Sequence, residues 1–166
     1  MKSVILAIAI ASLCAGEAAF AEEQVQPWSR ALEVVGYAET VRASFSKGCL
    51  KGNPLAGTTA YLVICPKLKS IPSGLIEAAA LPYLQKHLSV AEARAAIDFY
   101  TSPIGRGLLP KILREIETGK FDQLSPEDLQ QMDKANKTLF GQALKRFGTD
   151  KEANVAVARA MLAYEP

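Results

Sequence analysis

The stretch SVAEARAAIDFYTSPIG, residues 89–105, decides the fold class of this chain. Ser89 and Glu92 have the spacing of a capping box, in which each side chain binds a free backbone N–H at the start of a helix. Apolar residues then recur at the helical period. Ser102 stands before a proline, which disfavours helical torsion angles, so the pattern predicts a helix that ends near Thr101.

The same combination of helical period and cap signals extends outward over most of the chain. Glycines and prolines separate the periodic segments, and no repeat or low-complexity segment interrupts them. The predicted helices cover residues 27–47, 72–86, 89–101, 104–117, 125–147 and 149–164. We therefore expect an all-α fold: a single-domain helical bundle of about six helices.

Residues 48–70 are the least regular part of the sequence, because glycine and proline recur within them. The apolar run Ala60–Cys65 is short enough to be a strand or a buried helix, and periodicity does not separate the two. A single strand would have no partner to pair with, so the composition of the chain favours a short helix there.

The first 21 residues have the three parts of a cleavable signal peptide. Lys2 supplies the positive charge, Val4–Leu13 is a nearly unbroken apolar run, and Ala19-Phe20-Ala21 is a cleavage pattern. The apolar run is shorter than the roughly 20 residues that cross a bilayer. We expect residues 22–166 to form the mature domain, located in the periplasm or secreted, with no transmembrane span.

The mature chain would keep two of the three cysteines, Cys49 and Cys65, because Cys14 leaves with the signal peptide. The residues before Cys14 do not follow the usual pattern for lipid attachment. An even pair of cysteines in an exported chain indicates a disulfide rather than a metal site. This bridge would close a loop in the irregular segment and contribute about 3 kcal/mol through the unfolded state.

Few residues point to catalysis or to a cofactor. His87 is the only histidine, so neither a histidine-based metal site nor a Ser-His or Cys-His nucleophile has its usual partners. Its position before a capping serine is typical of a helix end, where a histidine favours the helix dipole. We therefore expect no cofactor and no metal. The sequence does not exclude catalysis by a pair of carboxylates, as in glycosidases. The candidate residues are Glu77, Glu92, Asp98 and Glu115.

The charge of the chain is nearly balanced, at +2, so no strong nucleic-acid partner is expected. Its distribution is uneven, because no acidic residue occurs between Thr40 and Ile76. Two interpretations remain for the basic residues of this segment: ordinary solvated side chains, or a patch for an anionic glycan, a lipid head group or an acidic protein. These residues are Arg42, Lys47, Lys51, Lys67 and Lys69.

Residues 93–109, ARAAIDFYTSPIGRGLL, resemble an exported bacterial family known as domain of unknown function 2059. The resemblance extends over about residues 72–118. It is carried by Phe99, Tyr100, Ser102, Pro103 and Gly105, with Arg106 where the family usually has lysine. It implies a helical exported domain and no particular activity. The same residues also have a purely structural interpretation, as a tight corner between two helices.

These observations favour a non-enzymatic, exported binding or protein-interaction module. The alternative is an enzyme, a cell-envelope hydrolase that uses a carboxylate pair. A narrower form of the binding-module hypothesis is an inhibitor that confers immunity to a secreted toxin. The expected partners are another envelope or secreted protein, or an anionic component of the envelope.

Overall fold

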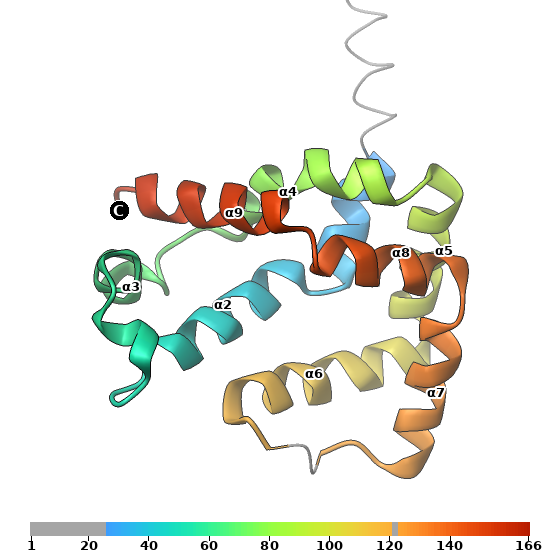
Figure 1. Cartoon of the computed structure of the whole chain (residues 1–166). Helices are drawn as coiled ribbons and strands as arrows, with labels where there is room; N and C mark the ends of the chain where they lie inside the picture. The colour runs from blue at the N-terminus through green and yellow to red at the C-terminus, as the bar shows by residue number, and fades with distance from the viewer. Residues whose placement is uncertain (1–25, 121–122) are drawn as a thin grey trace, which may run out of the picture.

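The computed structural model describes residues 26–120 and 123–166, and all regular secondary structure within them is helical. The predicted signal peptide lies outside the described residues. Residues 26–34 are helical. The elements that follow are α2 (Tyr37–Gly48), η1 (Pro54–Gly57), α3 (Thr59–Ile64), η2 (Cys65–Lys67), α4 (Ser73–His87), α5 (Val90–Thr101), α6 (Pro103–Thr118), α7 (Pro126–Asn136), α8 (Leu139–Gly148) and α9 (Lys151–Ala163), shown in Figure 1. The all-α fold class is confirmed.

The described part of the chain contains more helices than the six expected, because two predicted long helices are each broken once and α3 adds a short helix between the first two. The first break falls at Gly36, whose φ of 62° turns the chain between residues 26–34 and α2. Glycine adopts this left-handed conformation without a steric penalty. The second break falls at Thr138, which is extended and separates α7 from α8.

The run Ala60–Cys65 lies in α3 and the start of η2. Its sequence pattern is compatible with either a strand or a helix. The short helix that the composition favours is therefore confirmed. Ile64 is fully buried beneath it, so the apolar run serves to anchor a helical turn rather than to pair in a sheet.

The cap signals give a mixed outcome. The capping box of Ser89 and Glu92 is present at the start of α5, as predicted. The predicted start of the last helix, at residue 149, is two residues early, because Asp150 rather than Thr149 accepts the free N–H groups of α9. The Thr149 hydroxyl instead donates to carbonyls at the end of α8. Both residue types cap helices well, and their neighbours decide which one is used.

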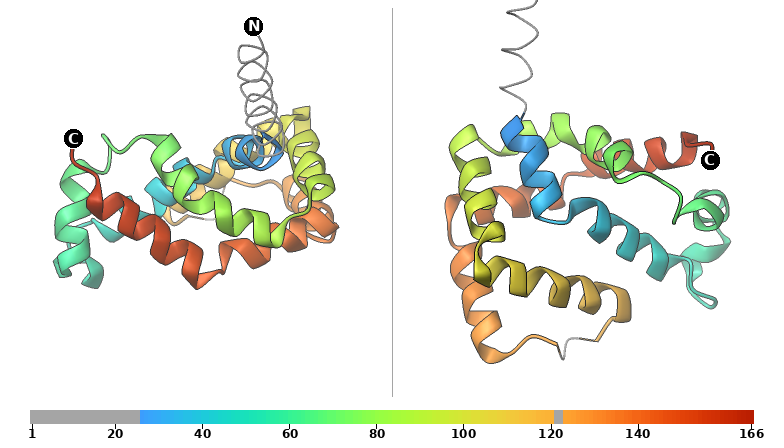
Figure 2. Two further views of the ribbon diagram at one scale, coloured as in Figure 1. Left: turned by 90° about the horizontal axis from the view of Figure 1, so that it is seen from above. Right: turned by 180° about the vertical axis from the view of Figure 1, so that it is seen from behind.

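One main core joins most of the elements. Helix α4 packs most extensively against α9, and α2 lies between this pair and α6, against which it packs, as the right-hand view in Figure 2 shows. Ile76 and Leu84 of α4 and Met161 of α9 are fully buried in this core. Helices α5 to α8 lie at one end of the molecule, and α3 lies at the opposite end (Figure 1).

Candidate functional site

The motif that carries the family resemblance forms a tight corner between α5 and α6. The Ser102 hydroxyl donates to the Phe99 carbonyl at 2.6 Å and accepts the Gly105 N–H at 3.2 Å. Pro103 takes the first position of α6, where a backbone N–H would have no helical partner in any case. One hydroxyl therefore closes α5 and opens α6.

Gly105 is required by the close approach of the two helices. A Cβ at this position would lie 2.2 Å from the Phe99 carbonyl oxygen and 2.5 Å from the Tyr100 Cα. Both contacts are with backbone, which cannot rotate away as a side chain could. The structural interpretation thus accounts for Ser102, Pro103 and Gly105. Arg106 is exposed on the outer side of the corner.

A second corner, between α7 and α8, repeats this geometry at Thr138. Its hydroxyl donates to the Ala135 carbonyl at 2.6 Å and accepts the Gly141 N–H at 3.1 Å. A Cβ on Gly141 would lie 2.1 Å from the Ala135 carbonyl oxygen and 2.8 Å from the Asn136 Cα. This corner is not predicted from the sequence, where residues 125–147 read as one helix. The signal that could have revealed it is the hydroxyl residue followed by glycine at the third position.

The two corners pack against each other in a small second core. The rings of Phe99 and Phe140 are 5.7 Å apart between centroids, and Ala96 and Ala135 are buried beside them. Tyr100 packs edge-on against Phe99, with the centroids 5.1 Å apart. This core fixes the end of α5 and therefore the position of the Tyr100 ring.

Tyr100 lines a cavity of about 450 Å³ that we call the aromatic groove. Helices α2, α5, α8 and α9 all contribute to it. Its lining residues are Val35, Tyr37, Thr40, Val41, Ser44, Phe45, Tyr100, Leu144, Phe147, Gly148, Asn154 and Val157. The volume falls within the range of about 300–1,000 Å³ that is typical of small-molecule sites. None of these lining residues carries a charge.

The polar groups of the groove are neutral and few. The hydroxyls of Tyr37 and Tyr100 make no hydrogen bond within the described part of the chain, whereas Ser44 donates to the Thr40 carbonyl. Burial raises the pKa of Tyr37 to about 12 and also raises the pKa of Tyr100. Both phenols therefore stay protonated near neutral pH and offer a ligand one donor each.

The four carboxylates considered for catalysis do not line the groove. Burial, followed by the nearby Glu39 and Glu33, raises the pKa of Glu77. None of the other three candidates is among the charges that act on Glu77. The charges that act on Glu77, which include Arg42 as a lowering influence, therefore belong to α2 and the preceding helix and not to another candidate.

The other three candidates have separate surroundings. Hydrogen bonds from Ser89 hold the Glu92 carboxylate at the start of α5 and lower its pKa. Asp98 is exposed on α5. Glu115 is buried in α6, and its Oε1 has no hydrogen-bond partner among the described residues. None of the four candidates lines the aromatic groove or the second cavity, which lies between α4 and α9.

His87 ends α4 and contacts the cap of α9. Its Nε2 lies 2.8 Å from the Asp150 Oδ2, while the Asp150 Oδ1 accepts the N–H groups of Glu152 and Ala153. The hydrogen bond from His87 is the largest cause of the lowered pKa of Asp150. The contact gives His87 a structural part at the helix end. Within the described residues, no group of three or more potential ligands is arranged to hold a metal ion.

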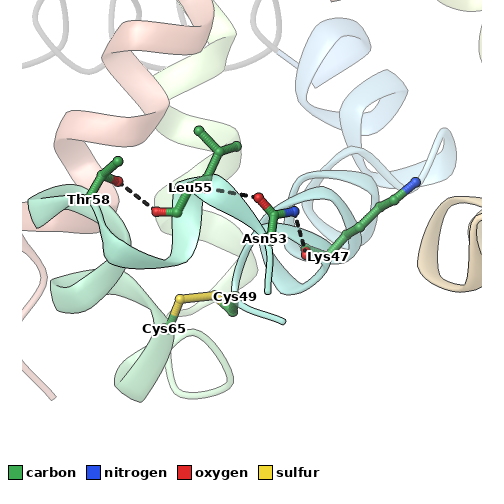
Figure 3. The surroundings of a disulfide bond; sticks show 6 residues. All are labelled: Lys47, Cys49, Asn53, Leu55, Thr58 and Cys65. Atoms are coloured by element: carbon green, nitrogen blue, oxygen red, sulfur yellow. Dashed lines mark hydrogen bonds between the residues drawn. A yellow bond between two sulfur atoms is a disulfide. The ribbon is translucent and has the colours of Figure 1, made fainter. Parts of the chain in front are cut away.

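The predicted disulfide between Cys49 and Cys65 is present, with an S–S distance of 1.97 Å and a Cα–Cα distance of 5.8 Å. It joins the end of α2 to the start of η2 (Figure 3). The bridge lies at the opposite end of the molecule from the two corners and does not line the aromatic groove.

The structure does not gather all five basic residues of the proposed patch. The Arg42 guanidinium donates to the Ile71 carbonyl and the Ser73 hydroxyl. The Lys67 ammonium donates to carbonyls at the end of α9. Lys47 extends toward the end of α6 near Gly119. The remaining two, Lys51 and Lys69, are exposed.

Residues 76–113 match the model of a family described as an uncharacterized protein conserved in bacteria, DUF2059. The match covers most of α4, all of α5 and the first part of α6, so it includes the Ser102 corner. It confirms the resemblance proposed from the sequence. The Thr138 corner and the disulfide lie outside the matched residues.

Neither a curated protein nor a solved structure matches the chain. In its described part, no helix is long and apolar enough to span a bilayer.

Proposed function

We propose that this protein is exported and binds an uncharged, largely apolar small molecule in the aromatic groove, without catalysing a reaction on it. The observation that carries the proposal is the composition of the groove. It combines the size of a small-molecule site with aromatic walls, no charged side chain and two tyrosine hydroxyls that lack a partner in the described chain. Apolar walls with a few convergent polar groups are typical of ligand sites.

The lining also favours binding over catalysis. General acid–base catalysis near neutral pH needs a group with a pKa close to the working pH. The carboxylates and His87 lie outside the groove, and the two tyrosines that line it have raised pKa values. A ligand with one or two hydrogen-bond acceptors on an apolar body would satisfy the tyrosine hydroxyls and cover the rings of Phe45 and Phe147.

The binding proposal is tested with the uncharged dye N-phenyl-1-naphthylamine, whose fluorescence rises in apolar surroundings. We expect saturable binding with a Kd on the order of 10 µM. Ser44→Trp would fill the groove from α2 and weaken binding at least tenfold. Ser46→Trp is the matched control, because Ser46 is exposed on the same helix and does not line the groove. Equal binding by both variants would place the dye elsewhere and contradict the proposal.

Export is tested separately by sequencing the N-terminus of the protein recovered from the periplasm. The cleavage pattern at Ala19-Phe20-Ala21 predicts a new N-terminus at Glu22. A retained Met1 or a lipid on Cys14 would contradict this part of the proposal and leave the dye experiment unaffected.

A further inference from the structure

The segment closed by the disulfide exposes an unusual share of apolar side chains. We call residues 49–70 the stapled lobe; it contains η1, α3 and η2. Nine large hydrophobic residues are exposed in the described part of the chain, and four of them belong to this lobe. Their exposed fractions are 58% for Leu50, 47% for Leu55, 63% for Leu62 and 43% for Val63. Such a concentration of exposed apolar side chains indicates a surface that binds a protein, a membrane or a ligand.

The outward direction of these side chains follows from how α3 is anchored. Ile64 is fully buried, and Tyr61 stacks on Phe45 at 5.4 Å between ring centroids. Because these two residues fix the inner face of α3, Leu62 and Val63 must lie on the outer face. Exposed Pro66 extends that face into η2.

The lobe is also held in this conformation by several bonds. The disulfide closes it, and the Asn53 side chain accepts the Leu55 N–H at 2.9 Å and donates to the Lys47 carbonyl at 3.1 Å (Figure 3). The Lys67 ammonium ties η2 to the Leu162 carbonyl at 2.8 Å. The apolar side chains of Leu55 and its neighbours therefore stay at the surface instead of folding inward.

The charge of the lobe has one sign. Lys51, Lys67 and Lys69 lie within it, and no acidic residue occurs between Thr40 and Ile76. In the described structure, no carboxylate forms an ion pair with any of these three lysines. Glu165 follows the end of α9 that Lys67 contacts. The three lysines and this one carboxylate together have a net formal charge of +2. The lobe thus combines an aliphatic surface with a positive field.

We propose that the stapled lobe binds the surface of a lipid bilayer that is rich in anionic phospholipids. Leu62, Val63 and Leu55 would enter the boundary between head groups and acyl chains. The exposed Lys51 and Lys69 would pair with lipid phosphates, while Lys67 keeps its bonds to the carbonyls at the end of α9. Lysine stems can lie along an apolar surface with the ammonium in the head-group layer. A protein partner fits less well, because protein interfaces are enriched in aromatic residues and arginine and depleted in lysine.

The test is sedimentation of the protein, recovered after export and therefore without residues 1–21, with phospholipid vesicles. Vesicles of equal parts phosphatidylglycerol and phosphatidylcholine should bind it, and pure phosphatidylcholine should bind it much more weakly. Raising the salt from 0.05 to 0.5 M should release it, since salt screens surface charges. Lys51→Gln with Lys69→Gln should weaken binding about 30-fold, from the roughly 1 kcal/mol that each lysine contributes near an anionic membrane.

Leu62→Ser with Val63→Ser should weaken binding at least tenfold, and circular dichroism should remain unchanged because both side chains are already exposed. The matched control is Leu139→Ser, which removes a side chain that is 73% exposed in α8, outside the lobe. Equal loss in the control and the lobe variant would overturn the proposal. Failure to bind either vesicle would also overturn it, as would binding to polyglutamate without binding to vesicles, because that result would indicate an acidic protein partner.

Discussion

The molecule makes the same turn between helices twice, at Ser102–Gly105 and at Thr138–Gly141. In both corners a hydroxyl bridges the carbonyl three residues before it and the glycine N–H three residues after it. The corners differ in the residue just before the turn. Tyr100 precedes the first corner and lines the aromatic groove, whereas Asn136, at the equivalent place in the second, is exposed.

This difference shows that the family-like motif has two roles, forming the turn between the helices and contributing to the wall of the aromatic groove. Hydroxyl and glycine form the turn in both corners, so they are structural wherever they occur. Tyr100 has no equivalent in the second corner, and its hydroxyl has no partner in the described chain. Tyr100 is therefore the residue of the motif that faces the proposed ligand.

The glycines should give the largest effect. Gly105→Ala and Gly141→Ala each place a Cβ within 2.2 Å of a backbone carbonyl oxygen, so the helices must separate. We expect each change to cost about 4 kcal/mol or more, a large part of the roughly 5–15 kcal/mol that stabilises a domain. Urea denaturation measures this. Gly107→Ala is the control, because its Cβ would meet nothing within 4 Å, and it should stabilise α6 slightly. A tolerated Gly141→Ala would mean that the two corners are not equivalent.

The phenylalanines that join the corners should give the next largest effect. Phe140 is 8% exposed, and Phe140→Ala should cost about 3–5 kcal/mol. Phe99 is only partly buried, so Phe99→Ala should cost less, about 2 kcal/mol. Melting curves of the two variants compare the costs directly. The reverse order would show that the first corner contributes more to the second core than its burial indicates.

The bridging hydroxyls should give equal, smaller effects. Ser102→Ala and Thr138→Ala each remove one acceptor for a helix N–H and one donor to a carbonyl, and each should cost about 1–2 kcal/mol. Ser102→Thr and Thr138→Ser keep the hydroxyl and should restore most of the lost stability. If Ser102→Ala alone were harmless, Pro103 would be sufficient to form the first corner.

The stability of the protein should depend on alkaline pH through Tyr100 at the first corner, and no residue at the second corner should have this effect. Burial raises the pKa of Tyr100 above the usual tyrosine value of about 10. The unfolded chain then loses this proton at a lower pH than the folded chain does. Stability is therefore fully present below pH 10 and is lost as pH rises through the raised value. Tyr100→Phe should reduce the fall in melting temperature between pH 9 and 11, whereas Asn136→Ala should leave it unchanged.

The corners also show which features could be predicted from the sequence. Pro103 and the Ser89 capping box interrupt the helical pattern visibly, so the first corner and α5 were predicted correctly. Residues around Thr138 continue the apolar period, and the requirement for Gly141 arises only from its contact with the backbone of Ala135 and Asn136. A long helix was therefore expected there.

The groove could not be predicted for a related reason. Its walls come from four helices that are distant in sequence, and local patterns do not determine how such helices pack. Tyr37 follows the Gly36 break, which the periodicity concealed, so even the orientation of its helix was unknown. The disulfide, in contrast, followed from cysteine number and the export signal alone.

The central claim, that the aromatic groove is the ligand site, is tested most directly by NMR of the chain with isotope-labelled tyrosine rings. The chain has five tyrosines, and two of them, Tyr37 and Tyr100, line the groove. On titration with N-phenyl-1-naphthylamine, the ring signals of these two should shift and saturate together, while those of Tyr83 and Tyr164 stay in place. Tyr83 lines a separate cavity between α4 and α9. A saturating shift of Tyr83 with unchanged Tyr37 and Tyr100 would contradict the account.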